Sequence, residues 1–142
     1  VGINCKNMIA TEQFYTKYFG FQRARVVPLG DRQIVFLKLG NTYLELFQAE
    51  GQAPLSPPSN DGPTHPGLRH IAFRVDDVEA KLSEMDAAAN ITQGPLSFDD
   101  FIPGWRAVWI ADPDGNIIEI SQGYLDQVKP PPLAAKLSDI AQ

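Results

Sequence analysis

Residues 70–78 read HIAFRVDDV, and the start of the chain, VGINCKNM, aligns with the last eight of them. Further along, residues 44–48 (LELFQ) align with residues 118–122 (IEISQ). Each half therefore opens with a short apolar strand and ends with a strand in which one glutamate, Glu45 or Glu119, lies between two aliphatic residues. Because internal repetition indicates a repeated structural unit, the sequence predicts two copies of one small module that face each other.

The pattern of each half reads βαβββ, which defines an α+β fold. The first half predicts a helix that Asn7 caps and Gly20 ends, then strands over residues 21–27, 33–38 and 42–48. The second half predicts a strand over residues 68–75, a helix with Asp76 and Glu79 as a capping box, and strands over residues 91–96, 105–111 and 116–122.

These elements predict one domain over residues 1–128, made of two modules at about 1–49 and 68–124. Residues 50–67, rich in Pro, Ser and Gly, form the predicted linker between them. Residues 129–142 form a C-terminal tail, for which a free surface position and packing on a partner subunit are both open.

Composition excludes several classes of protein. A net charge of −5 disfavours nucleic acid as a partner, and no apolar run approaches the ~20 residues that span a bilayer. The single cysteine and the lack of a signal-peptide pattern favour a reducing, cytoplasmic setting. A buried small hydrophobe is a better interpretation of Cys5 than a catalytic thiol.

Alternation along the strands predicts the neighbours of the polar residues. His70 shares a face with Ala72 and Arg74, while Glu45 and Glu119 project from otherwise apolar strands. One such glutamate alone would indicate only a solvated strand face. Two glutamates at positions related by the repeat, with a histidine at the start of the second half, favour a functional site.

The chain resembles the vicinal oxygen chelate superfamily, which includes glyoxalase I, methylmalonyl-CoA epimerase, extradiol dioxygenases and the fosfomycin- and bleomycin-resistance proteins. The resemblance rests on Phe14-Tyr15 through Phe19-Gly20-Phe21, on Leu44-Glu45-Leu46, and on residues 70–77 and 112–119. It implies two βαβββ modules that form a curved mixed sheet around a cleft with a divalent metal ion.

The resemblance also implies a site. Glu45, His70 and Glu119 fall on three metal-ligand positions, and the fourth would lie immediately before Val1. A Glu/His/Glu set suits Zn, Ni, Co, Mn or Fe(II) and leaves positions open for substrate oxygens. The ion would polarise a carbonyl and stabilise an enediolate, with Glu119 or Glu45 as the catalytic base.

Departures from glyoxalase I leave the substrate open. Asn4 replaces the arginine that anchors glutathione, and Ala49 and Phe101 stand where two further contacts would be, so a hemithioacetal substrate is not supported. The candidate substrate-binding residues are Asn4, Arg74, Phe101, Trp105 and Arg106. Most of them have an alternative interpretation. Phe101 and Trp105 could be core residues, Arg74 could form an ion pair, and Arg106 could face solvent. For His65, solvent exposure is the main interpretation and a lid is the alternative.

The predicted function is that of a metal-dependent lyase or isomerase, acting on a small carbonyl or hydroxy-acid compound through enediolate chemistry. A metal-free, ligand-sequestering binding protein is the alternative, and an Fe(II) extradiol-type dioxygenase is the third. The resemblance and the open strand edges of each module also predict a homodimer.

Overall fold

The computed structural model describes residues 1–53, 55–56, 62–63 and 65–132, so parts of the predicted linker and of the tail lie outside the described residues. The first module contains, in order, β1 (Gly2–Cys5), α1 (Met8–Phe19), β2 (Gln22–Leu29), β3 (Arg32–Leu39) and β4 (Thr42–Gln48). The second contains β5 (Ile71–Arg74), α2 (Val78–Met85), the short 3-10 turn η1 (Asp86–Ala88), β6 (Asn90–Ser97), β7 (Arg106–Ala111) and β8 (Ile117–Gln122). The predicted pair of βαβββ modules is confirmed.

Each module forms its own four-stranded mixed sheet, in the orders β1-β4-β3-β2 and β5-β8-β7-β6. The first strand of each module runs parallel to the last, and the remaining pairs are antiparallel. Gly2 lies opposite Glu45 in the first sheet, and Ala72 lies opposite Glu119 in the second. The sequence repeat is therefore also a repeat of strand register.

Side chains that cap the helices set where they begin. The Asn7 side chain accepts hydrogen bonds from the backbone N–H groups of Ile9 and Ala10, at 3.0 and 3.2 Å, as the sequence predicted. The cap of α2 is Asp77 rather than the predicted Asp76, and it accepts from Ala80 N–H at 2.9 Å. Within the described residues, no helix is long and apolar enough to cross a membrane.

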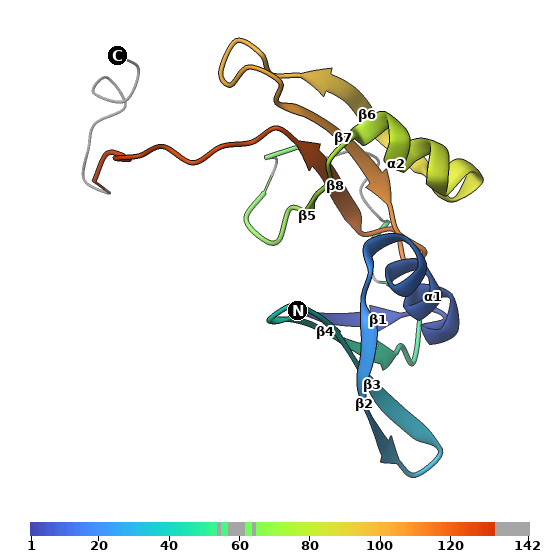
Figure 1. The fold of residues 1–142 in the computed structure, drawn as a ribbon. Helices are drawn as coiled ribbons and strands as arrows, with labels where there is room; N and C mark the ends of the chain where they lie inside the picture. The colour runs from blue at the N-terminus through green and yellow to red at the C-terminus, as the bar shows by residue number, and fades with distance from the viewer. Residues whose placement is uncertain (54, 57–61, 64, 133–142) are drawn as a thin grey trace.

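Helix α1 of the first module faces the second module (Figure 1). Its aromatic residues and Phe21 surround Phe73 of β5, with ring centroids 4.5 Å away for Phe19, 5.9 Å for Phe21 and 6.3 Å for Tyr15. One buried apolar cluster therefore includes residues of both modules. The modules are packed together by the first module's helix.

Polar contacts at the turn between β7 and β8 add to this joint. The buried Tyr15 hydroxyl donates to Asp112 Oδ2 at 2.6 Å, and the Thr11 hydroxyl donates to Asp114 Oδ2 at 2.6 Å. Burial, followed by the charge of Asp112, raises the pKa of Tyr15 far above its ordinary value, so its hydroxyl remains a proton donor. The Asp112-Pro113-Asp114-Gly115 sequence thus makes a turn, as predicted, and also binds α1.

Candidate functional site

Each sheet has one face packed in the shared core, and we call the opposite face its open face, although in the second sheet a small cluster of Ala107, Trp109 and Ile117 is buried there. In β4, Leu44 and Leu46 belong to the buried cluster, so Glu45 between them projects to the opposite face. In β8, Ile118 and Ile120 belong to the same cluster, and Glu119 projects to the open face in the same way. Both glutamates are thus on the faces that the sequence predicted for a site.

His70 and Glu119 lie side by side. His70 immediately precedes β5, and its Nε2 is 2.9 Å from Glu119 Oε2. Both side chains are largely covered, with 21% and 15% of their surfaces exposed. An imidazole nitrogen and a carboxylate oxygen this close can both contact one bound ion or one substrate proton.

Glu45 lies on the other sheet. It is half-buried, and a Cβ built on Gly2 would lie 3.9 Å from its Oε2, so the carboxylate is beside the start of β1. Among the residues that the structure describes, no three His, Cys, Asp or Glu side chains lie close enough to hold one metal ion. Of the three predicted ligands, one chain therefore brings together His70 and Glu119, and places Glu45 apart.

The chemistry of the His70 and Glu119 donors suits a divalent ion. A neutral imidazole nitrogen and a carboxylate oxygen are common ligands of Zn, Mn, Ni and Fe(II). Two protein donors are fewer than the three that catalytic metal sites usually have. His70 and Glu119 by themselves would thus supply two ligands to a divalent ion, and a complete site would need at least one further ligand.

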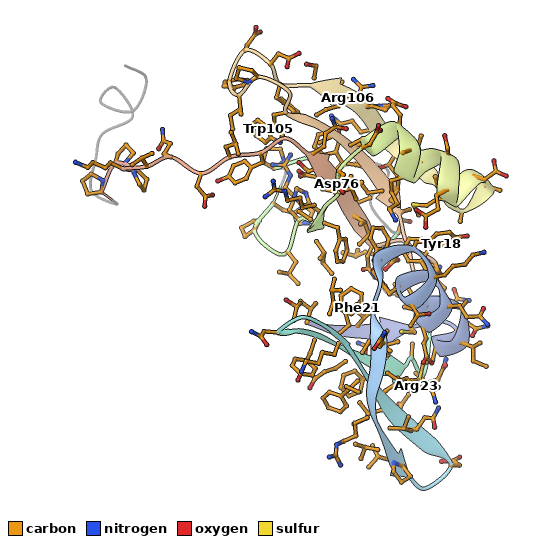
Figure 2. The ribbon with its side chains drawn as sticks, in the orientation of Figure 1. Tyr18, Phe21, Arg23, Asp76, Trp105 and Arg106 are labelled. Carbon is orange, nitrogen blue, oxygen red and sulfur yellow. The ribbon has the colours of Figure 1, made fainter. Side chains whose placement is uncertain are left out.

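A group of aromatic side chains lies on the same face of the second sheet as Glu119, and Trp109 is the member beside it. Trp109 lies directly opposite Glu119 in the β7–β8 register and is 7% exposed. The Phe98 ring is 6.3 Å from that of Trp109 and 4.8 Å from that of Trp105, which in turn is 5.8 Å from Tyr124. We call Phe98, Trp105, Trp109 and Tyr124 the aromatic cluster; Figure 2 labels Trp105 near the root of the C-terminal segment.

Of the four residues of this cluster, the sequence predicted only Trp105 as a site residue. Phe98, Trp109 and Tyr124 were not among the candidates. Pairing β7 with β8 across the Asp112 turn would have placed Trp109 opposite Glu119, because an antiparallel hairpin determines which residues face each other.

The other candidate residues have different positions. Asn4 and Arg74 are exposed on the open faces of their sheets. Phe101 is 77% exposed in the loop between β6 and β7, so it is not a core residue. His65 is exposed, as the solvent interpretation predicted.

Arg106 lies on the other side of its sheet. It shares a face with Val108 and Ile110 of the buried cluster, and its Nη2 pairs with Glu79 Oε1 of α2. The structure therefore does not bring Arg106 to the His70 and Glu119 pair. The physical reason is that alternation along β7 places the Arg106 side chain on the face covered by α2, where it contacts the Glu79 carboxylate.

The loop from residue 98 to residue 105 is tied to its surroundings. Asp99 accepts a hydrogen bond from the Ser97 hydroxyl at 2.7 Å and one from Gly104 N–H at 2.6 Å, and these contacts lower the pKa of its carboxyl. Trp105 Nε1 donates to Ser121 Oγ at 3.1 Å. The loop thus holds the Trp105 indole against β8, two residues from Glu119.

Comparison with known proteins now gives the family. A model of the Glyoxalase/Bleomycin resistance protein/Dioxygenase superfamily matches residues 1–120. The chain belongs to this superfamily. No curated protein sequence matches the chain.

Solved structures share the fold. A glyoxalase family protein from Enterococcus faecalis is 31% identical with a TM-score of 0.64, and the match covers 85% of this chain and 93% of that one. A lactoylglutathione lyase from Agrobacterium tumefaciens is 25% identical with a TM-score of 0.56, over 87% and 90% of the two chains. The antibiotic-binding protein TnmS3 from a Streptomyces species is 20% identical with a TM-score of 0.57, over 87% and 93%, which shows the fold alone.

Proposed function

We propose that this superfamily member is a divalent-metal-dependent lyase or isomerase that acts on a small carbonyl or hydroxy-acid compound. The observation that carries the proposal is the contact of 2.9 Å between His70 Nε2 and Glu119 Oε2 on the open face of the second sheet. A ligand-binding cleft without a metal has no physical reason to keep a covered carboxylate beside an imidazole, because burying such groups costs free energy. The similarity to a lactoylglutathione lyase supports the same class of reaction.

The third ligand, Glu45, comes from a second copy of the chain in this proposal. Glu45 and Glu119 have equivalent positions in the two modules, opposite Gly2 and Ala72 respectively. A twofold dimer that brings the open face of one first module against the open face of a second module would form two equal sites. Each site would then contain His70 and Glu119 of one copy and Glu45 of the other.

The protein side chains have distinct tasks in this site. His70 and Glu119 would hold the ion, and Glu45 would be the base that takes a proton from the carbon next to the substrate carbonyl. When bound, the ion would supply Lewis-acid stabilisation of the negative charge that develops on the substrate oxygen. Trp109, opposite Glu119 in the strand register, would shield that carboxylate from water on the side of β7, which would strengthen its electrostatic interactions.

A binding protein that sequesters an apolar ligand is the second candidate. The aromatic cluster favours it, because grouped indole and phenyl rings on an open sheet face can stack on a flat ligand. The fold that this chain shares with an antibiotic-binding protein is compatible with it. Metal affinity separates the two candidates, since sequestration needs no ion.

The decisive experiment is metal binding by mixed dimers. Glu45→Gln and Glu119→Gln chains carrying different tags are purified alone and after co-expression, and their binding of Mn(II) and Zn(II) is measured by calorimetry. We expect each variant alone to bind weakly. Random pairing makes half of the dimers mixed, and each mixed dimer has one intact site, so binding capacity should return to about a quarter of that of the wild type.

Glu84→Gln is the matched control. Glu84 is an exposed glutamate of α2 that pairs with Lys81, so its substitution should leave metal affinity unchanged. Failure of the mixed dimers to regain binding would reject a site shared between copies. Wild-type affinity for divalent ions no better than millimolar would reject the enzyme proposal and place the binding protein first.

A further inference from the structure

The indole nitrogen of Trp109 is a buried hydrogen-bond donor without a partner. Among the described residues, Trp109 Nε1 and Thr92 Oγ1 are the two buried side-chain polar atoms in this condition. Leaving a buried donor unsatisfied costs on the order of 1–3 kcal/mol. Such groups are rare in folded proteins, so this donor calls for an acceptor that the described residues do not supply.

The position of Trp109 indicates where that acceptor comes from. Trp109 lies directly opposite Glu119, and its ring packs against Phe98 in a small cluster with Ala107 and Ile117 on the open face. The neighbouring Trp105 differs, because its own indole N–H already donates to Ser121. The two tryptophans of the chain therefore stand at one site, one with its donor satisfied and one with its donor unused.

A positively charged side chain, that of Arg74, lies on the strand next to β8. Arg74 of β5 is exposed and pairs in the strand register with Ser121, the residue that holds Trp105. The order of the strands places β8 between β5 and β7. A ligand beside Glu119 can thus reach Arg74 on one side and the Trp109 ring on the other, since adjacent strands lie about 4.8 Å apart.

We propose that Trp109 Nε1 is a ligand hydrogen-bond donor, and that the ligand is an aromatic oxo or hydroxy acid. Its ring stacks in the aromatic cluster, its oxo or hydroxyl oxygen accepts from Trp109, and its carboxylate pairs with Arg74. This rests on the proposed function, whose substrate class it narrows. Because the indole nitrogen is buried, the side chains packed around the Trp109 ring, which include Phe98, must move when the ligand enters.

The test uses the two indole N–H signals in a proton–nitrogen correlation spectrum of the full chain, without metal. The Trp105→Phe variant assigns the remaining signal to Trp109. The probes are benzoylformate, which has a ring, an oxo group and a carboxylate, and phenylacetate, in which a methylene replaces the oxo group. We expect benzoylformate to move the Trp109 signal to higher proton frequency and to slow its exchange with water. Phenylacetate should do neither.

Affinity gives a second measurement. Trp109→Phe keeps an aromatic ring but removes the donor, so benzoylformate should bind about 5- to 30-fold more weakly while the affinity for phenylacetate stays the same. Trp105→Phe should weaken both probes equally, because both keep the ring that stacks. Pyruvate, which lacks a ring, should bind more weakly than either aromatic probe.

Three results would overturn the proposal. The first is a Trp109 signal that does not move at saturating benzoylformate. The second is an equal loss of affinity for benzoylformate and phenylacetate in Trp109→Phe. The third is a Trp109 N–H that contacts a long-lived water molecule and keeps it when benzoylformate binds. None of these measurements involves turnover or a metal ion. A failure here is therefore distinguishable from a failure of the metal-binding test.

Discussion

The hydroxyl of Tyr15 offers a direct test of the joint between the modules. Tyr15→Phe removes one hydroxyl from α1 and leaves the ring in place among Phe14, Phe19 and Phe21. Asp112 Oδ2 then loses its contact of 2.6 Å and keeps the one from Asn116 Nδ2 at 3.0 Å. Because Asp112 is 5% exposed, water cannot easily replace the lost donor.

The expected loss follows from the kind of bond. A hydrogen bond to a charged group contributes about 1.5–3 kcal/mol to folding. Asp112 Oδ1 still accepts from the backbone N–H groups of Asp114 and Asn116, each at 2.9 Å, so the turn itself remains. For a chain of this length, each kcal/mol shifts the melting temperature by about 2–4 °C, so Tyr15→Phe should lower it by ~3–12 °C.

Thermal unfolding followed by circular dichroism measures this shift. Tyr18→Phe is the matched control, because Tyr18 is the next tyrosine of the same helix and its ring is only partly buried against the core. The control should unfold within about 1 °C of the wild type, since surface substitutions seldom change stability by more than ~0.5 kcal/mol. Equal melting temperatures for Tyr15→Phe and Tyr18→Phe would refute the view that the Asp112 turn holds the modules together.

Three further predictions concern single positions. Gly123 has φ +77°, and Gly123→Ala would place a Cβ 2.2 Å from the Gly104 carbonyl oxygen, whereas Gly30→Ala, at φ +64°, meets nothing within 4 Å. We therefore expect Gly123→Ala to lower the free energy of unfolding by ~1–3 kcal/mol more than Gly30→Ala does. Equal unfolding midpoints of the two variants in urea would contradict this. Burial raises the pKa of Cys5 to about 11, so a thiol reagent at pH 8 should label it only after unfolding, and stability should fall as pH rises from about 9 toward 11. Adding a histidine before Val1 should tighten metal binding by ~10- to 100-fold, and equal affinities of the two chains would exclude a ligand at that position.

The repeat was the part of the fold that the sequence predicted best. Alternating apolar residues on either side of Glu45 and Glu119 determine strand register, because a shift by one residue would turn the whole apolar set toward solvent. Turn and cap residues such as Asn7 and Gly20 act over a few residues, and their roles were confirmed. The cap of α2 was misplaced by one residue because Glu79, three residues after Asp76, favours Asp76 over Asp77 in the sequence. Gln122 decides between them by accepting from Val78 N–H.

Contacts between distant elements could not be predicted in this way. Arg106 was expected to meet a substrate, and it pairs instead with Glu79, 27 residues earlier in the chain. The contact of Tyr15 with Asp112 joins residues 97 positions apart. Both depend on how α1 and α2 pack on the second sheet, which no local pattern encodes. His70 and Glu119 were easier to place together because one parallel strand pair brings them there.

The asymmetry of the joint explains why one chain separates Glu45 from the other two candidates. Helix α1 of the first module packs against Phe73 and the Asp112 turn of the second, and Lys81 Nζ of α2 donates to the Tyr18 carbonyl at 2.7 Å. The modules thus meet through their helices and covered faces (Figure 1). Contacts that occupy the covered faces leave both open faces outside the joint. The face that carries His70 and Glu119 therefore lies where a second copy could meet it, which is the arrangement that the mixed-dimer experiment tests.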